Sequence, residues 1–359
     1  MDTLLSVAEY EAAARERLPD GIWDYVCGGS GEERTLAANR EAFARLALRP
    51  SAFVDVSRPD TATELFGAPL RAPIGVAPVA YHQLAHPEGE VATARAAELL
   101  VVSVFASRTL EEIAAAASGP LWLQLYWFRR REVVTGLVRR AEAAGYRALV
   151  LTVDTPRVGR RLRDVRRGFA VPAGIVAANV DAAVMARSHE AVAGESALAR
   201  HSREQFDPSL GWADLSWLCA QTDLPVLVKG VLTGADAARA MAHGAAGVVV
   251  SNHGGRQLDG AVASVDALAE VAAAVAGRGP VLLDGGVRTG TDALRALALG
   301  ASAVLVGRPV LWGLAVDGES GARAVLDILA AEMEEAMVLS GRPRLSDVDL
   351  SLLAVSQHQ

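Results

Sequence analysis

The sequence predicts an α/β fold, a closed (β/α)8 barrel, on three observations. Short, nearly continuous apolar segments occur eight times in the 359 residues, and amphipathic Ala/Glu/Arg-rich segments lie between most of them. Several of these helical segments end at a glycine just before the next strand, as helices often do. A doubly wound sheet typically has fewer strands and a GxGxxG motif after the first, which is absent here. The fold class is therefore that of the TIM barrel, with expected strands at 74–80, 101–105, 121–126, 148–154, 225–230, 247–255, 280–286 and 303–308.

The remaining segments are assigned in chain order within one expected domain, 1–359. Residues 1–70 precede the first strand and are expected to form a helical extension that closes the bottom and side of the barrel, which itself occupies 71–359. The interval between strands four and five is long, so 155–215 is expected to be an insertion or lid. Its Ala-rich part, 172–205, is expected to be a loop or partial helix over the active-site face. The tail after strand eight is expected to form two helices.

Composition excludes several classes of protein. Apolar residues make up 51% and charged residues 21% of the chain, enough for a large core, and the net charge is −7. The absence of a basic stripe argues against a nucleic-acid partner, and the absence of an apolar run of about 18 residues argues against a membrane span. The first twenty residues mix acids and bases, unlike a targeting peptide, so a cytoplasmic location is expected. Cys27 and Cys219 are too few for a disulfide framework or a metal cluster, and no metal is expected.

The basic residues have an unusual distribution. Of the 35 Lys and Arg residues, a single one is lysine, Lys229. Arginine therefore supplies the ordinary surface charge, and an ammonium group is not interchangeable with a guanidinium. The sequence thus predicts a chemical role for Lys229.

Polar residues recur where the expected strands end, which is where a barrel of this class places its chemistry. Any one of them could be a satisfied buried hydrogen bond, but recurrence at the same end of nearly every strand favours a site. The residues at these ends are Ala80, Tyr81, Ser103, Gln124, Tyr126, Thr152, Asp154, Lys229, Ser251, Asn252, His253, Asp284, Gly307 and Arg308.

Two glycine-containing turns on the last two strands predict a phosphate site. DGGVRTG (284–290) and LVGRPV (305–310) each end a strand and begin a helix. Glycine allows the backbone to approach an anion closely, and free amides at a helix start stabilise negative charge. The loops after strands seven and eight often bind phosphate in this barrel, so a phosphorylated cofactor or substrate is expected.

SNHGGRQLDG (251–260) predicts an acid–base and carboxylate-binding site. His253 supplies a base near neutral pH, and Arg256 supplies a guanidinium fork suited to a carboxylate. The arginines of TVDTPRVGRRLRD (152–164) are expected either to be solvated or to provide a second guanidinium. The remaining histidines are expected to be structural or at the surface: His82, His86, His189, His201, His243 and His358.

Together these motifs resemble the FMN-dependent α-hydroxy acid oxidase/dehydrogenase family, which includes glycolate oxidase, lactate oxidase and mandelate dehydrogenase. The resemblance runs from LPDGIWDY through AHPEGE, QLY, LTVDTPRVGRR, LPVLVKGV, VSNHGGRQLD and LDGGVRTGTD to LVGRPV. Within the family, APVAYHQLAHPEGE, QLYW and GRRLRDVRRGFAVP are most similar to the 4-hydroxymandelate oxidases of antibiotic biosynthesis.

The resemblance implies a role for each site residue. His253 corresponds to the base and Asp154 to the carboxylate that stabilises its imidazolium. Arg256 and Arg161 correspond to the carboxylate clamp, with Arg163 a weaker candidate. Hydrogen bonds to the substrate are implied for Tyr25 and Tyr126; a positive charge beside the flavin for Lys229; flavin-ring contacts for Ala80, Ser103, Gln124, Thr152 and Ser251; and contacts to the ribityl chain and phosphate for Asp284, Gly286, Arg288, Gly307 and Arg308.

The implied reaction is the oxidation of a 2-hydroxy carboxylate, with (4-hydroxy)mandelate favoured, to the 2-keto acid. FMN takes up the electrons and O2 reoxidises it to give H2O2. A lactate- or glycolate-type oxidase and a dehydrogenase of the same family remain open, and the resemblance also implies a homotetramer. More distant alternatives are a Schiff-base aldolase that uses Lys229 as nucleophile and a catalytically inactive FMN-binding protein.

Overall fold

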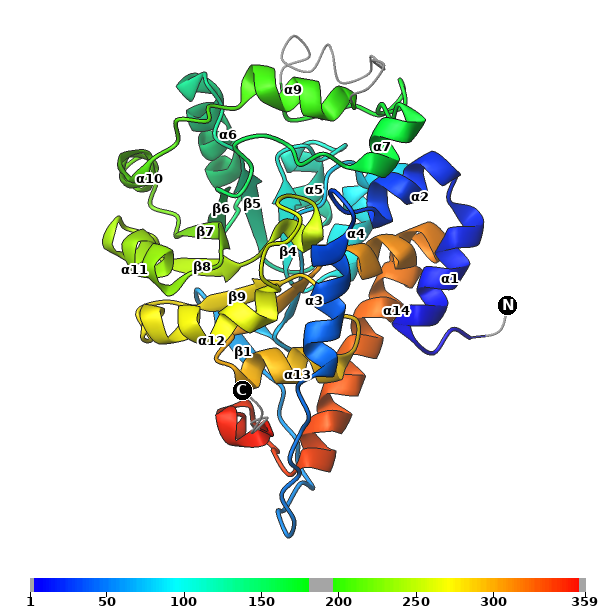
Figure 1. The fold of residues 1–359 in the computed structure, drawn as a ribbon, viewed down its shortest axis with the longest axis vertical. Helices are drawn as coiled ribbons and strands as arrows, with labels where there is room; N and C mark the ends of the chain where they lie inside the picture. The colour runs from blue at the N-terminus through cyan, green and yellow to red at the C-terminus, as the bar shows by residue number, and fades with distance from the viewer. Residues whose placement is uncertain (1–2, 181–195, 355–359) are drawn as a thin grey trace.

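Eight parallel strands form a closed barrel at the centre of the computed structural model, which describes residues 3–180 and 196–354 (Figure 1). The strands follow one another around the barrel in chain order, and the last pairs with the first. Each lies in or overlaps a predicted segment, so the predicted TIM barrel is confirmed. The strands are β3 (Ile74–Val76), β4 (Leu100–Ser103), β5 (Leu121–Leu125), β6 (Ala148–Thr152), β7 (Val226–Val231), β8 (Gly247–Val250), β9 (Val281–Asp284) and β10 (Ala303–Val306).

Helices follow the strands and cover the outside of the barrel (Figure 1). Their starts are fixed by side chains: Thr109, Thr233 and Thr289 each accept a hydrogen bond from a backbone amide of the first turn. The helices are α4 (Glu90–Ala96), α5 (Leu110–Ala116), α6 (Arg131–Ala143), α10 (Trp212–Cys219), α11 (Gly234–Ala242), α12 (Ser264–Val275), α13 (Gly290–Ala298) and α14 (Arg308–Ser340).

Two helical predictions for the barrel are confirmed in detail. Gly145, Gly244 and Gly300 follow α6, α11 and α13 with positive φ, as helix C-termini favour. In α14 the backbone leaves helical geometry at Asp317 and Gly318, so the tail consists of two helical parts.

The barrel interior is filled by apolar side chains from alternate strand positions. Trp122, the largest fully buried side chain of this interior cluster, packs with Val101, Val150, Leu227 and other buried residues. This packed core leaves the carboxyl ends of the strands as the place for a cavity.

A β-hairpin, and not a helix, closes the bottom of the barrel. β1 (Thr63–Leu65) pairs antiparallel with β2 (Ala68–Leu70). Leu65 and Leu70 join the interior cluster, and Phe66 packs against Trp122 with 5.6 Å between ring centroids. The prediction that 1–70 is a helical extension is therefore wrong for 63–70. Three-residue strands are too short to show a pattern, and the two-residue turn at Phe66 and Gly67, which both have positive φ in the structure, lacks the Asn-Gly or Asp-Gly sequence that marks such turns.

The N-terminal helices lie at the side and mouth of the barrel. These are α1 (Val7–Arg17), which packs against α14, α2 (Asp20–Cys27) and α3 (Arg34–Ala44). The backbone at Gly29 lies against Gly255, in the loop that follows β8. α2 and α3 therefore help to build the active-site end of the barrel. The prediction had placed this N-terminal segment at the bottom and side of the barrel instead.

The insertion between β6 and β7 supplies α7 (Leu162–Arg167) and α9 (Ala197–Gln205). In Figure 1 both lie above the barrel, over the mouth, as the sequence predicted for this segment. Residues 181–195 of the predicted 172–205 loop lie outside the described part of the chain. The insertion ends earlier than the predicted residue 215, because α10 already begins at Trp212 and packs beside α11 as a barrel helix.

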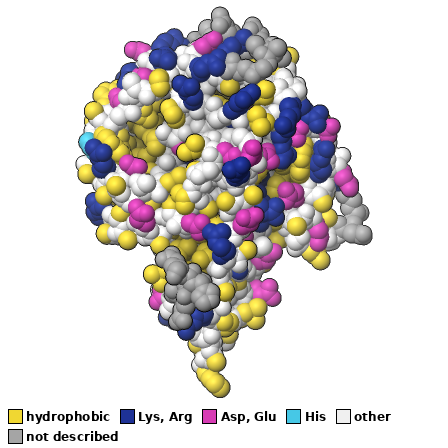
Figure 2. All heavy atoms as spheres, in the orientation of Figure 1, with side chains coloured by type: hydrophobic (Ala, Val, Ile, Leu, Met, Phe, Trp, Pro, Cys, Tyr) yellow, Lys and Arg dark blue, Asp and Glu magenta, His cyan; other side chains and the backbone are white. Residues whose placement is uncertain are grey.

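Basic and acidic side chains intermix over the face shown in Figure 2, consistent with the absence of a basic stripe in the sequence. The segment that joins α3 to β1 projects from the lower end, and its tip is hydrophobic, with Phe53 and Val54 exposed. Within residues 3–180 and 196–354, no helix combines the length and apolarity that a membrane span requires.

Candidate active site

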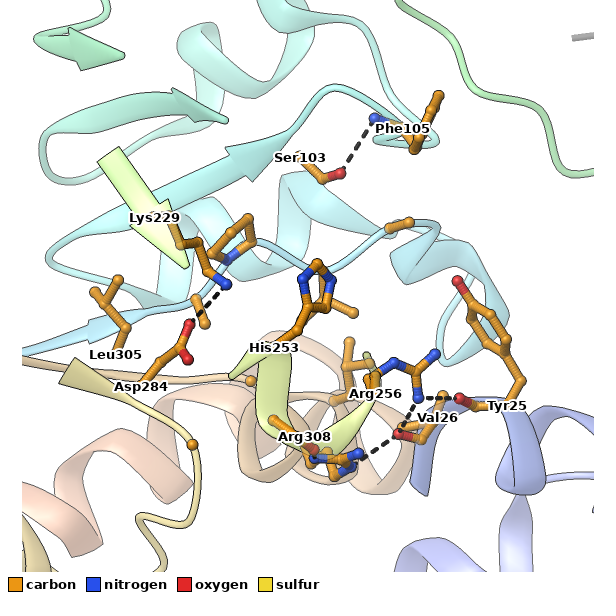
Figure 3. A pocket seen from close by; sticks show the side chains of 18 of the residues that line it. Tyr25, Val26, Ser103, Phe105, Lys229, His253, Arg256, Asp284, Leu305 and Arg308 are labelled. Carbon is orange, nitrogen blue, oxygen red and sulfur yellow. Dashed lines mark hydrogen bonds and ion pairs between the residues drawn. The ribbon is translucent and has the colours of Figure 1, made fainter. Parts of the chain in front are cut away.

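A cavity of about 1170 Å³, counted with its solvent-filled mouth, lies at the carboxyl ends of the strands. This is large enough for a cofactor together with a small substrate. Lys229 on β7 shares this cavity with His253 and Arg256 from the loop after β8, as the sequence predicted (Figure 3). Thirteen of the predicted site residues line it: Tyr25, Ala80, Ser103, Tyr126, Arg161, Lys229, His253, Arg256, Asp284, Gly286, Arg288, Gly307 and Arg308.

His253 is held as a neutral base. Its Nδ1 lies 2.9 Å from Asp154 Oδ1, and because a carboxylate can only accept, Nδ1 carries the proton and Nε2 is left as an acceptor. Burial lowers the pKa of His253 below its ordinary value, although Asp154 acts in the opposite direction. Burial would raise the pKa of Asp154, but His253 and Lys229 together hold it below its usual range. The pair is therefore neutral imidazole and carboxylate at neutral pH.

The loop that presents His253 is fixed by a pair of amides. Asn39 of α3 donates to Asn252 Oδ1 at 2.8 Å, and Asn252 donates to Asn39 Oδ1 at 2.7 Å. Asn252 also accepts from the Gly255 amide, and His253 itself has φ of +59°. Sequence reasoning did not identify this link, although asparagine occurs just three times in the chain.

Lys229 is buried and charged. Its Nζ donates to Ser251 Oγ at 2.9 Å and lies 3.1 Å from Asp284 Oδ2. Burial would lower the pKa of Lys229, but Asp284 and Asp154 outweigh it and raise the pKa. A Schiff-base nucleophile must be a neutral amine, so this environment argues against the aldolase alternative.

Three predicted flavin contacts do not line the cavity in this structure. Gln124, Thr152 and Ser251 are buried in the wall, where Gln124 bonds to Thr152, and Ser251 bonds to Lys229 and Asp284. Ser103 Oγ lies 3.3 Å from Gln124 Oε1, and Gln124 Nε2 donates to Thr152 Oγ1 at 3.0 Å. This row of polar groups continues the layer formed by Lys229 and provides hydrogen-bonding atoms beside the cavity.

Two guanidiniums of the cavity, the buried Arg161 and the half-buried Arg256, have no carboxylate in close contact among the described residues. Arg161 has no partner for Nε among the described residues, and its nearest carboxylate, Asp164, lies 3.9 Å away. Arg256 donates to the carbonyl of Tyr25 at 2.6 Å (Figure 3). It also donates to the carbonyl of Gly28 at 2.9 Å. Burial and then Arg256 lower the pKa of Arg161 to about 10. Their surplus charge attracts a carboxylate, and the planar fork suits one.

Arg163, the weaker candidate for this clamp, is engaged elsewhere. It forms ion pairs with Glu33 at 2.5 Å and with Asp24 at 3.7 Å and does not line the cavity. Its own partners therefore neutralise it.

The residues expected to bind phosphate form a second cationic cradle. Arg308 donates to the carbonyls of Val26 and Gly254, each at 3.0 Å, and burial followed by neighbouring arginines lowers its pKa. Arg288 is half-buried, and its buried Nε has no partner among the described residues. Gly286 has φ of +92°, and a Cβ there would lie 2.2 Å from the Asn39 carbonyl oxygen. With the uncapped start of α14 at Gly307, these groups fit the phosphate of FMN.

The two tyrosines remain protonated donors. Tyr25 stacks on Phe169 with 4.5 Å between ring centroids, and Tyr126 stacks on Phe206 at 4.7 Å. Burial raises the pKa of both hydroxyls. Each can therefore donate a hydrogen bond to a substrate oxygen.

An aromatic wall and a histidine were missed by sequence reasoning. Phe105, Phe206 and His201 line the cavity, and because His201 is buried, the surface position that was one of its two expected alternatives is excluded. Phe105 stands at the end of a predicted strand, which was an available signal. Nothing in the sequence showed which face of α9 points into the barrel mouth. Among the described residues, no cluster of three His, Cys, Asp or Glu could hold a metal ion.

Comparison with known proteins agrees with the site. The model of the FMN-dependent dehydrogenase family matches residues 14–355. The chain is 50% identical to the 4-hydroxymandelate oxidase of Amycolatopsis orientalis over 343 residues, 94% of this chain and 95% of that protein. It is 47% identical to an L-lactate oxidase of Nostoc over 97% and 98% of the two chains, and 45% identical to the glycolate oxidase of Spinacia oleracea over 98% and 96%.

Solved structures give the same result. A crystal structure of mandelate oxidase with (S)-4-hydroxymandelic acid matches with a TM-score of 0.94 and 48% identity over 98% of each chain. Another mandelate oxidase structure matches with a TM-score of 0.90 and 47% identity over 99% of each. The protein therefore belongs to the FMN-dependent dehydrogenase family and is an FMN-dependent 2-hydroxy acid oxidase.

Proposed function

We propose that this oxidase converts an aromatic 2-hydroxy carboxylate, (S)-mandelate or (S)-4-hydroxymandelate, to the corresponding 2-keto acid. One observation supports this choice above others. The cavity that contains His253 and the arginine pair is walled by Phe105, Tyr126 and Phe206, whose rings stack with centroids 4.7 to 6.1 Å apart. A wall of this kind suits an aromatic ring better than the hydrogen or methyl group of glycolate or lactate.

The residues of the chain would act as follows. Arg161 and Arg256 bind the substrate carboxylate, which fixes the α-carbon. His253 accepts a proton at Nε2, and the carboxylate of Asp154 stabilises the imidazolium that forms. Tyr126, with Tyr25, donates a hydrogen bond to a substrate oxygen. FMN, when bound, accepts the two electrons that leave the substrate.

The same proposal assigns the cofactor contacts. The ammonium of Lys229 would stabilise negative charge on the flavin, and the two-arginine cradle would hold the phosphate. The other proposed contacts from the cavity lining are Ala80 and Ser103 to the flavin ring, and Asp284, Gly286 and Gly307 to the ribityl chain and phosphate. Gln124, Thr152 and Ser251 stand directly behind this lining, and we propose that their polar atoms reach the flavin ring once it is bound.

The substrate preference is tested by anaerobic flavin reduction. We expect (S)-4-hydroxymandelate or (S)-mandelate to reduce the bound flavin at least about tenfold faster than lactate or glycolate at equal, subsaturating concentration, because burial of the ring contributes about 1.5–3 kcal/mol. Stopped-flow absorbance of the flavin measures this. Faster reduction by lactate or glycolate would contradict the aromatic assignment and leave family membership intact.

The acceptor is tested in the same sample. We propose that O2 reoxidises the enzyme with formation of H2O2, so admission of air should restore the flavin spectrum within seconds and yield one H2O2 per substrate. Slow recovery that is accelerated by an artificial electron acceptor would indicate a dehydrogenase.

Arg161→Met tests the carboxylate clamp. Loss of a charge-assisted hydrogen bond is expected to lower kcat/KM by about 10- to 150-fold, from ~1.5–3 kcal/mol. Arg163→Met is the matched control, because Arg163 is a neighbouring arginine outside the cavity, and its kcat/KM should change less than about threefold. Equal losses in the two variants would argue against a specific clamp at Arg161.

We also propose, from the family resemblance, that the enzyme is a cytoplasmic homotetramer. Light scattering after size-exclusion chromatography should then give about four times the chain mass of 37.5 kDa. Cell fractionation tests the location.

A further inference from the structure

His201 lies in the cavity wall with both ring nitrogens unsatisfied. It belongs to α9, its exposed fraction is 2%, and it lines the same cavity as His253. Among the described residues, neither Nδ1 nor Nε2 of His201 has a hydrogen-bond partner. Buried polar atoms without a partner are costly, so a ligand group is the expected partner.

The surroundings of His201 suit an aromatic ring. Its imidazole meets Phe105 edge-on, with 5.8 Å between centroids and an interplanar angle of 75°. Phe105 in turn stacks with Tyr126 at 5.5 Å and with Phe206 at 6.1 Å. His201 is therefore a polar residue set among flat apolar faces.

His201 also lies away from the charged groups of the base and the clamp, which are Asp154, Arg161 and Arg256. The pKa of Tyr126 is influenced by Asp154, Arg161 and Arg256, which places Tyr126 beside the base and clamp. Burial lowers the pKa of His201, and among the described groups Glu204 alone acts to raise it. At neutral pH the His201 ring is therefore neutral and has one N–H donor and one acceptor nitrogen.

We propose that His201 determines specificity for a hydroxyl group at the 4-position of the substrate ring, by forming a hydrogen bond with it. This inference depends on the proposed oxidation of an aromatic 2-hydroxy acid. With the substrate carboxylate on Arg161 and Arg256, the ring would extend along the aromatic wall and its 4-position would lie farthest from the clamp. A phenolic hydroxyl both donates and accepts, which matches either nitrogen of the neutral imidazole.

The neighbouring polar side chains are less suited to this role. Ser202 is satisfied, since its Oγ accepts from the Val158 amide at 3.2 Å and donates to the Ala199 carbonyl at 2.9 Å. Tyr81 is the competitor, because its buried hydroxyl also has no partner among the described residues. The Tyr81 ring stacks on Phe105 with 6.4 Å between centroids, but after burial the largest contribution to its raised pKa comes from Tyr25, whose ring lies 5.1 Å from the Arg256 guanidinium. Tyr81 therefore lies between the aromatic wall and the clamp.

The test compares two substrates in four proteins: wild type, His201→Phe, His201→Gln and Tyr81→Phe. We expect the wild-type kcat/KM for (S)-4-hydroxymandelate to exceed that for (S)-mandelate by about tenfold, the effect of one hydrogen bond. His201→Phe should abolish this preference, His201→Gln should keep part of it, and Tyr81→Phe should keep it. The readout is the ratio of the kcat/KM values for the two substrates. A general loss of activity lowers both values and leaves this ratio unchanged.

A binding measurement gives a second readout without turnover. The Kd values of 4-hydroxybenzoylformate and benzoylformate, measured from the change in flavin absorbance, should differ by about tenfold in wild type and become equal in His201→Phe. His201→Gln, whose amide retains a donor and an acceptor, supplies the result if His201→Phe fails to fold.

Three outcomes would overturn the assignment of His201. These are an unchanged ratio in folded His201→Phe or His201→Gln, loss of the preference in Tyr81→Phe instead, and no preference in wild type. Failure of the proposed function looks different. In that case lactate or glycolate reduces the flavin and neither aromatic acid does. The proposed oxidation of an aromatic 2-hydroxy acid and the role of His201 are then both rejected.

Discussion

Substitution of His253 by asparagine is expected to lower the rate of substrate-dependent flavin reduction by about 10²- to 10⁴-fold, the range for loss of a positioned general base. In the proposed mechanism Nε2 of His253 is the proton acceptor, and the Nδ1 contact with Asp154 leaves this nitrogen available. Asparagine is chosen because residue 253 has φ of +59°, a conformation that asparagine tolerates better than alanine. The variant should keep its bound flavin, which the visible spectrum reports.

The pH profile distinguishes loss of a base from distortion of the site. Because only neutral imidazole accepts a proton, wild-type kcat/KM should fall as the pH drops through the pKa of His253, which burial places below the ordinary value of about 6.5. His253→Asn should lack this acid limb. His243→Asn, at a histidine bonded to Ser216 outside the cavity, is the matched control and should retain rate and profile. A His253 variant that keeps the wild-type rate would remove this residue from the base role.

The sequence was sufficient to predict the barrel because its elements repeat. The apolar segment around Val226–Val231 and the helix that follows it show the same order as seven other units, so each supports the assignment of the rest. The hairpin at 63–70 has no such repetition. Its assignment depends on tertiary contacts of Leu65 and Phe66 with the barrel interior, which local pattern does not encode.

The reactive end of the site was predictable for a related reason. Lys229, His253 and Asp284 lie at strand ends, and a parallel barrel brings those ends together independently of the conformation of the loops. Site residues on loops and on the helices of the insertion were harder to predict. His201 and Arg163 belong to the long insertion between β6 and β7, and only the observed path of α7 and α9 shows that one lines the cavity and the other does not.

Lys229→Met is expected to have the second large effect, on both stability and flavin chemistry. The Lys229 ammonium lies 3.1 Å from Asp284, and both side chains are buried. Removal of one partner from a buried ion pair leaves an uncompensated charge, at a cost of ~3–5 kcal/mol. The thermal denaturation midpoint should therefore fall by several degrees. Arg15→Met, which breaks an exposed ion pair with Asp20, is the control and should leave the midpoint nearly unchanged.

A double variant separates the two roles of this lysine. Lys229→Met with Asp284→Asn removes both charges and keeps a side chain that can hydrogen bond Ser251, so most of the lost stability should return. Flavin reduction should not return, because the fixed positive charge that favours electron uptake is still missing. Rates of anaerobic reduction at saturating substrate, measured beside the denaturation midpoints, give both readouts. If reduction recovered with stability, Lys229 would be a structural partner of Asp284, and the flavin would be activated by other groups of the cavity.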